Sequence, residues 1–108
     1  MTVLELSKLE NFEPVNISDE GREVEGVYCG DLLSWVMGKA RSGDAWITIM
    51  SNINILAVAT LCDVSCIILS ESVAVDENVI EVSKQKGINI LKTSLTTFET
   101  AVLLNESL

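Results

Sequence analysis

The chain has 108 residues, 48% of them hydrophobic, and its sixteen acidic and seven basic residues give it a net charge of −9. This length fits a single domain over residues 1–108. The charge excludes nucleic acid as a partner, because affinity for a phosphate backbone comes from lysine and arginine displacing counterions. The hydrophobic content exceeds what a monomer of this size hides, so we expect a homodimer.

The N-terminal segment is acidic and begins with a helix signal. Thr2 and Glu5 form a capping-box pattern, which predicts a short helix ending near Glu10. Phe12 to Ile17 is predicted to be an edge strand, since Pro14 cannot donate a hydrogen bond to a central ladder. We expect the acids here to form a solvated face, with docking of a basic partner as the alternative. They are Glu5, Glu10, Glu13, Asp19, Glu20, Glu23 and Glu25.

From Val24 onward, strands and helices alternate. Val24 to Cys29 is the next predicted strand, and Gly30-Asp31 turns it into a helix over Leu32 to Ala40. Trp35 falls outside the apolar stripe of that helix, so it packs under a loop or faces a partner. The first helix and the edge strand form a hairpin-like N-terminal segment. After it, strand and helix alternate four times.

The middle of the chain predicts a buried strand over Ala45 to Met50, with Ser51-Asn52 as the cap of a helix running to about Asp63. That helix is apolar nearly all round, so we expect it to be buried on both sides, with a second subunit covering one of them. The candidate dimer-interface residues are Trp35, Ile53, Leu56, Ala57 and Leu61.

The C-terminal part supplies the remaining elements. Cys66 to Leu69 is a strand, Asp76 caps a helix that Gly87 ends, Ile88 to Leu91 is the last strand, and Thr96 opens a capping box with Glu99. This order predicts an α/β fold, a mainly parallel sheet flanked by helices in three layers, with an N-terminal helix and edge strand.

A membrane span is the alternative interpretation of Ala45 to Leu69, whose only formal charge is Asp63. Its polar side chains would lack partners in hydrocarbon, and its composition changes from β-branched to alanine- and leucine-rich and back. We therefore expect a strand, a helix and a strand in a chain without a membrane partner. With no export signal at the N-terminus, we expect a cytoplasmic protein.

The three cysteines, Cys29, Cys62 and Cys66, form no CxxC pair, and histidine is absent. We expect structural buried thiols and no metal site. Activation of Cys29 near a helix N-terminus is the alternative, and the predicted elements place Cys62 and Cys66 on different ones.

Polar residues follow each predicted parallel strand at its carboxyl end, where open α/β sheets bind ligands. A small polar or phosphorylated ligand is one interpretation, and ordinary caps and turns are the other. The candidate ligand-binding residues are Gly30, Asp31, Ser51, Asn52, Ser70, Glu71, Ser72, Lys92, Thr93 and Ser94.

Catalytic motifs are absent from the sequence. It has no phosphate-binding G-x-x-x-x-G-K-[ST], no G-x-G-x-x-G opening a helix and no G-x-S-x-G elbow. Without histidine, no recognisable pair of nucleophile and base remains. We expect a protein that is not an enzyme and that has no cofactor.

Three segments resemble the DRTGG domain family over nearly the whole chain. They are V-Y-C-G-D-L-L-S-W-V-M-G-K-A at 27–40, W-I-T-I-M-S-N-I-N-I-L-A-V-A-T-L at 46–61 and T-S-L-T-T-F-E-T-A at 93–101. The middle segment is similar to small stand-alone members, sometimes encoded beside iron hydrogenases. The resemblance implies an α/β fold, a homodimer and a regulatory role, and larger relatives carry the domain beside phosphotransacetylases or CBS-containing pyrophosphatases. Relatives labelled HPr serine kinases are no guide to activity, because this chain lacks a phosphate-binding loop.

The chain departs from the family at its name-giving residues. Asn52-Ile53 stands where the aspartate and arginine would fall, and Ser70-Glu71-Ser72 where the threonine and two glycines would fall. Loss of the arginine and gain of Glu71 disfavour an anionic ligand. The sequence therefore favours a homodimeric regulatory or assembly module that binds a protein partner or is accessory to a redox enzyme. A nucleotide or phosphometabolite sensor is the alternative.

Overall fold

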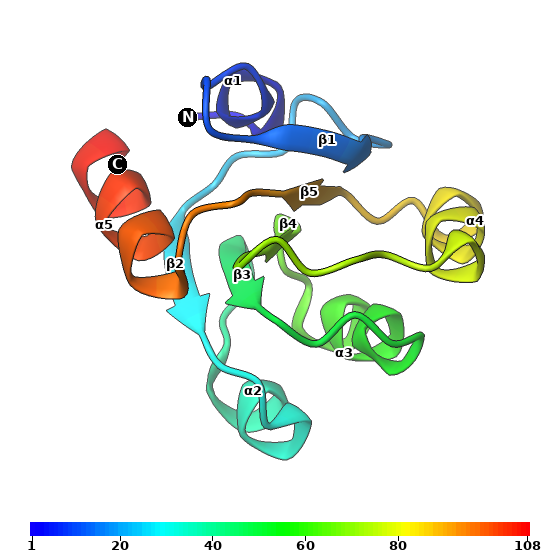
Figure 1. The fold of residues 1–108 in the computed structure, drawn as a ribbon. Coiled ribbons are helices and arrows are strands. Elements are labelled where there is room, and N and C mark those ends of the chain that lie inside the picture. Colours follow the sequence, from blue (N-terminus) through cyan, green and yellow to red (C-terminus); the bar gives the residue numbers. More distant parts are fainter.

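The computed structural model describes all residues, 1–108, and shows one sheet between two layers of helices (Figure 1). In chain order, the elements are α1 (Val3–Ser7), β1 (Glu13–Asn16), β2 (Gly26–Cys29), α2 (Leu33–Lys39), β3 (Asp44–Thr48), α3 (Asn54–Cys62), β4 (Cys66–Leu69), α4 (Glu77–Lys86), β5 (Ile90–Lys92) and α5 (Thr97–Ser107).

The sheet has the strand order β1-β5-β4-β3-β2. The neighbours β2 and β3, β3 and β4, and β4 and β5 are parallel, whereas β1 pairs antiparallel with β5. The predicted mainly parallel α/β sheet with β1 at an edge is therefore confirmed. The strands β1 and β2 lie at opposite edges of the sheet, and each pairs with a later strand.

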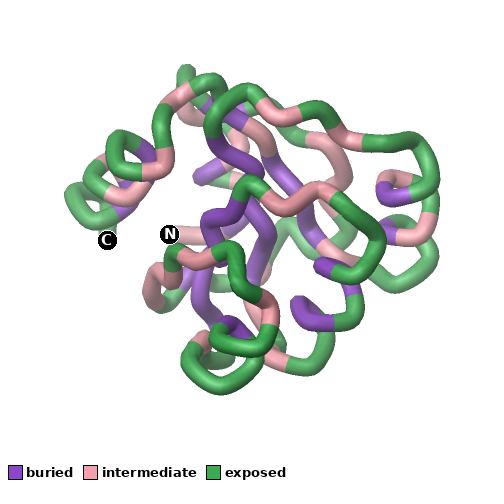
Figure 2. Tube along the Cα trace, turned by 60° about the horizontal axis from the view of Figure 1, so that its bottom comes forward, coloured by how far each residue is buried: buried purple, intermediate pink, exposed green.

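Helices cover both faces of the sheet (Figure 1), which confirms the three layers. On one face, α1 and α5 bury Val3, Leu6 and Leu104 against alternate strand residues such as Ile47 and Ile68. On the other face lie α2, α3 and α4, which contribute the core residues Val36, Ile55, Leu56 and Val79. Every residue of β3 and β4 is buried, as expected of parallel strands covered on both sides (Figure 2).

The helix signals of the sequence have mixed outcomes. Both capping boxes are present, with Thr2 and Glu5 opening α1 and Thr96 and Glu99 opening α5. Gly87 ends α4 in the left-handed conformation. Asp76 takes the N-cap position of α4 but makes no side-chain hydrogen bond there.

The apolar middle of the chain, residues 45–69, forms β3, α3 and β4, as predicted. No helix of the structure reaches the length and apolarity that crossing a membrane requires. Within the single chain, α3 is covered on one side and exposed on the other, so the predicted cover of its second side by another subunit stays a prediction. Ile53, Ala57 and Leu61 face outward, while Leu56 is 1% exposed and packs in the core. Leu56 therefore offers no surface to a partner, which corrects its assignment to the dimer interface.

Candidate functional site

The loops predicted to bind a ligand lie at the same end of the sheet, where the parallel strands β2, β3, β4 and β5 have their carboxyl ends. Their polar groups, however, mostly bond to one another or to the backbone. None of the structure's cavities is lined by any of the ten residues.

Asp31 ties the end of β2 to the end of β3. Its Oδ1 accepts hydrogen bonds from Thr48 Oγ1 at 2.8 Å and from the Ile49 backbone N–H at 3.0 Å. The expected cap on α2 is wrong, because Leu32 takes the N-cap position and makes no side-chain hydrogen bond. Gly30 contributes its carbonyl, which accepts from the Trp46 indole at 2.9 Å.

Ser51-Asn52 does not cap α3 in the manner expected. The helix starts at Asn54, with Ile53 at the N-cap position and no side-chain cap there. Asn52 Oδ1 instead accepts from the Asn54 backbone N–H at 2.9 Å, which makes a local turn ahead of the helix.

The loop after β4 holds an unusual backbone conformation. Glu71 and Ser72 have φ angles of 63° and 58°, in the left-handed region that favours glycine. Glu71 Oε2 accepts a 2.7 Å hydrogen bond from the Thr97 backbone N–H, so its carboxylate occupies the amino-terminal end of α5. The hydroxyls of Ser70 and Thr97 lie 2.8 Å apart. The carboxylate of this chain thus supplies the negative charge that a helix N-terminus prefers.

The loop after β5 is also engaged internally. Lys92 Nζ lies 3.8 Å from Glu13 Oε2 across the antiparallel pair of β5 and β1. Thr93 is buried, and its hydroxyl donates to the Asn11 carbonyl at 2.7 Å. Ser94 is exposed.

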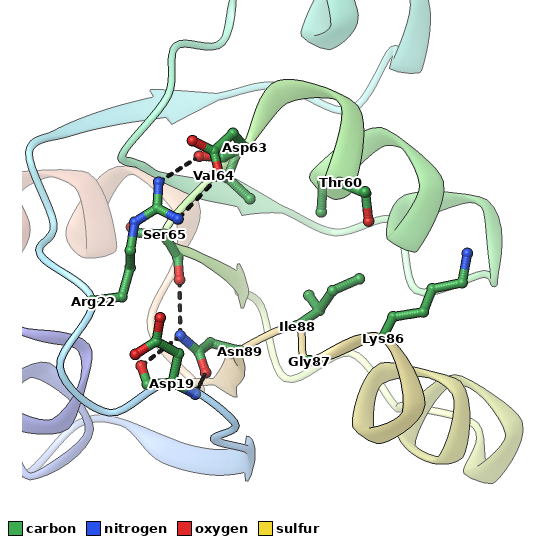
Figure 3. A pocket seen from close by; sticks show the side chains of 11 residues that line it. Asp19, Arg22, Thr60, Asp63, Val64, Ser65, Lys86, Gly87, Ile88 and Asn89 are labelled. Carbon is green, nitrogen blue, oxygen red and sulfur yellow. Dashed lines mark hydrogen bonds and ion pairs between the residues drawn. The ribbon is translucent and has the colours of Figure 1, made fainter.

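A pocket of about 170 Å³ lies at the opposite end of the sheet, where the parallel strands begin, between the C-terminal ends of α3 and α4 (Figure 3). It is smaller than the roughly 300 Å³ or more of typical small-molecule sites. Its lining residues are Asp19, Arg22, Ala59, Thr60, Asp63, Val64, Ser65, Lys86, Gly87, Ile88 and Asn89.

One ion pair, between Arg22 and Asp63, lies at this pocket. Arg22 donates to Asp63 Oδ1 at 3.0 Å and to the Asp63 carbonyl at 2.9 Å, and so closes the C-terminal end of α3. Hydrogen bonds, first from Arg22 and then from Ser42, hold the pKa of the Asp63 carboxyl below its usual value. The guanidinium neutralises both the carboxylate and the negative end of the helix.

Asn89, which is buried, organises the chain before β2. Its Oδ1 accepts from the Ser18 and Asp19 backbone N–H groups at 2.8 and 2.9 Å, and its Nδ2 donates to the Asp19 and Ser65 carbonyls at 3.0 Å. Sequence reasoning missed this residue and Arg22, since both act on partners distant in sequence. The only local signal was an asparagine inside a predicted buried strand. The side chains of Arg22, Asp63 and Asn89 are thus committed to the fold, so this side of the pocket acts as a structural junction.

The helices α2 and α3, which are adjacent on one face of the sheet (Figure 1), carry several exposed apolar side chains. Trp35 is 59% exposed and Leu61 is 69% exposed, and Leu32, Met37 and Ile53 are exposed as well. Lys39 Nζ stacks 4.3 Å from the centre of the Trp35 ring. Neither helix carries an acidic residue, although the chain has sixteen.

The cysteines do not form a reactive site. Cys66 is buried, Cys62 is half-buried and Cys29 is exposed, so the expectation of a buried thiol is wrong for Cys29. Partial burial, with the nearby charge of Asp31 as the smaller cause, raises the pKa of the Cys29 thiol, which opposes activation. As expected, Cys62 and Cys66 lie on different elements, α3 and β4.

Comparisons with known proteins address the family and the fold. The family model described as the DRTGG domain matches residues 18–107. Among solved structures, the chain is similar to the CBS and DRTGG domains of the regulatory region of a Clostridium perfringens pyrophosphatase, crystallised with the activator diadenosine tetraphosphate. The TM-score is 0.70 at 21% sequence identity, over 90% of this chain and 43% of that chain. The likeness shows a shared fold, and this chain spans less than half of that one. No curated protein matches the sequence.

Proposed function

Because the chain belongs to the DRTGG domain family, we propose that it is a non-catalytic regulatory or assembly module that acts as a homodimer in the cytoplasm. Residues 1–108 form one domain in this proposal. The residues ahead of the family match supply α1 and β1, and Val3 and Leu6 of α1 lie fully buried in the same core as α5.

The observation that carries the dimer is the acid-free apolar face of α2 and α3. Trp35, Ile53, Ala57 and Leu61 are all exposed on it, and two of them are large side chains more than half exposed. A chain of net charge −9 repels its own copies. The face that brings two copies together is therefore the one on which no carboxylate meets another, and aromatic and aliphatic side chains are typical of interface cores.

Sedimentation at micromolar concentration tests this proposal. The wild-type chain should sediment as a dimer, and Leu61→Glu should weaken the dimer by about 30-fold or more, because it buries a charge in an apolar interface at a cost of about 2 kcal/mol or more. Phe98→Glu, which places the same charge on an even more exposed side chain of α5, is the matched control and should leave the dimer intact. A wild-type chain that sediments as a monomer at all concentrations contradicts the proposal.

The regulated partner that we propose to test first is a redox enzyme, on the strength of the resemblance to small members encoded beside iron hydrogenases. Co-purification from the native cell extract, with Leu61→Glu as the comparison, tests whether a partner binds the dimer or the single subunit. Recovery of no enzyme with either form argues against an accessory role.

A small-molecule sensor is the second candidate, since the similar pyrophosphatase region was crystallised with diadenosine tetraphosphate. Against it stand the Glu71 carboxylate at the start of α5 and the finding that none of the ten candidate residues lines a cavity. Thermal unfolding in excess diadenosine tetraphosphate, nucleotides and phosphometabolites decides between them, because a ligand at about 100 times its Kd stabilises the fold by about 2.7 kcal/mol. A shift of that size would favour the sensor.

A further inference from the structure

A second exposed apolar surface runs along α5, on the opposite face of the sheet from α2 and α3. Phe98, Val102 and Glu106 follow one another at helical spacing and form an outward ridge, while Thr100 and Leu104 are buried beneath the helix. Phe98 is 77% exposed, the highest value among the large hydrophobic side chains of the chain.

Grooves flank this ridge on both sides. The groove toward β2 has a volume of about 440 Å³ and is lined by Val27, Cys29, Ala101 and Asn105 besides the ridge. The groove on the other side, of about 270 Å³, is lined by Asn11, Leu95, Glu99 and Leu103 besides the ridge. Since β2 is the last strand of the sheet, the first groove opens onto a free strand edge.

The charge of this surface is of one sign. The residues that line the two grooves include Glu99 and Glu106 and no lysine or arginine, and α5 has no basic residue at all. Glu106 lies in the last turn of α5, where the unpaired carbonyls already make the helix end negative. No cation of the chain offsets this charge, because the three ion pairs of the structure lie elsewhere.

We propose that the Phe98–Val102–Glu106 ridge with its two grooves binds a basic amphipathic segment of another protein. Apolar side chains of that segment pack on Phe98 and Val102, and its lysine or arginine side chains meet Glu99, Glu106 and the C-terminal end of α5. A second copy of the chain is excluded as the occupant, since it would set these carboxylates against their own counterparts. The proposal rests on the regulatory role proposed above and names the partner chemistry.

The test uses a fluorescent synthetic helix of leucine and lysine at amphipathic spacing, with an otherwise identical peptide carrying glutamate in place of lysine. Anisotropy titrations should show saturable binding of the basic peptide only. Phe98→Ala should weaken it by about tenfold or more, the loss expected when a central aromatic anchor is removed. Leu61→Ala on α3 is the matched control and should change the affinity less than about twofold.

Glu106→Lys separates binding from folding. A cation in the last turn of α5 suits the helix end, so this variant should unfold at the same or a higher temperature than the wild type and yet bind the basic peptide more weakly. Equal affinity of the wild type, Phe98→Ala and Glu106→Lys, or the absence of saturable binding, overturns the proposal.

Failure of this proposal and of the dimer are distinguishable. Added salt should weaken peptide binding, which pairs opposite charges, and should strengthen a dimer of two chains of net charge −9. If the chain is a monomer that still binds the basic peptide through Phe98, only the proposal of a dimer is contradicted. If the chain is a dimer that does not bind the peptide, only the proposal of a binding site at the ridge is contradicted.

Discussion

Replacing Ser72 and Glu71 by glycine, one at a time, should change stability in opposite directions. Both residues hold left-handed backbone conformations with φ near 60°, which cost a residue with a side chain about 1–2 kcal/mol. Glycine relieves that cost but adds about 0.4–1 kcal/mol of unfolded-state entropy. Since the Ser72 side chain makes no hydrogen bond in the structure, Ser72→Gly should stabilise the chain by up to about 1 kcal/mol.

Glu71→Gly removes a contact as well as strain. The Glu71 carboxylate accepts the 2.7 Å hydrogen bond from the Thr97 N–H, and a bond to a charged group contributes about 1.5–3 kcal/mol, with the lower end appropriate for an exposed side chain. The expected net result is a destabilisation of up to about 1.5 kcal/mol. Glu71→Gln, which keeps an acceptor without the charge, should fall between the wild type and Glu71→Gly.

Urea unfolding at one fixed protein concentration measures these differences, because a change in midpoint at constant slope reports stability alone. Each kcal/mol also corresponds to about 4–8 °C in Tm for a domain near this size. If Glu71→Gly and Ser72→Gly stabilise the chain equally, the carboxylate contributes nothing at the start of α5, and the argument that it excludes an anionic ligand fails.

Three further predictions concern the scaffold. Gly43→Ala should destabilise the chain by about 1–2 kcal/mol, because Gly43 has a φ of 87°, whereas Gly38→Ala in α2, where a Cβ meets nothing within 4 Å, should stabilise it by about 0.5–1 kcal/mol; urea unfolding checks both signs. Arg22 lowers the pKa of Asp63, so their pair stabilises the folded chain above the unfolded-state pKa of about 3.9 and loses this effect as the pH falls through the lower folded value. Asp63→Asn should therefore lose less stability in that acid range than the wild type, and thermal unfolding at each pH should show a difference worth less than about 1 kcal/mol for this exposed pair. Burial raises the pKa of Cys66 to about 12, so a thiolate reagent at neutral pH should label it only after unfolding, as mass spectrometry of native and urea-treated samples would show; rapid native labelling of Cys66 would contradict its place in the core.

Local patterns predicted most elements of the fold. The alternation of apolar runs and capping residues located β3, α3 and β4, and Pro14 marked β1 as an edge strand, because these signals depend on neighbours in sequence. The side of the sheet on which β1 pairs was not predicted. Its partner β5 lies more than seventy residues away in sequence. Asn89 holds the loop that follows β1 by bonding to backbone groups of Ser18 and Asp19, which no local pattern identifies.

Surface and core were harder to separate on α3 and α5. An all-apolar helix gives no amphipathic stripe, so sequence could not tell that Leu56 points inward while Leu61 points outward. On α5, Phe98, Ala101, Val102 and Leu104 follow one another as apolar residues in the sequence, and the structure divides them between core and surface. The positions of the helices above the sheet decide which side of each helix is covered, and these depend on crossovers and loop lengths.

The loop after β4 keeps a glycine-like backbone conformation although it contains no glycine. The resemblance places two family glycines at Glu71 and Ser72, and both positions keep the left-handed conformation that glycine adopts at no steric cost. The surrounding hydrogen bonds, from the Glu71 N–H to the Leu95 carbonyl and from the Ser72 N–H to the Thr93 carbonyl, impose that conformation on residues that disfavour it. A side chain forced to project from this loop reaches the start of α5, where an amide favours negative charge. A glutamate there offsets part of its own backbone strain, because its carboxylate accepts a hydrogen bond at a helix start that favours negative charge.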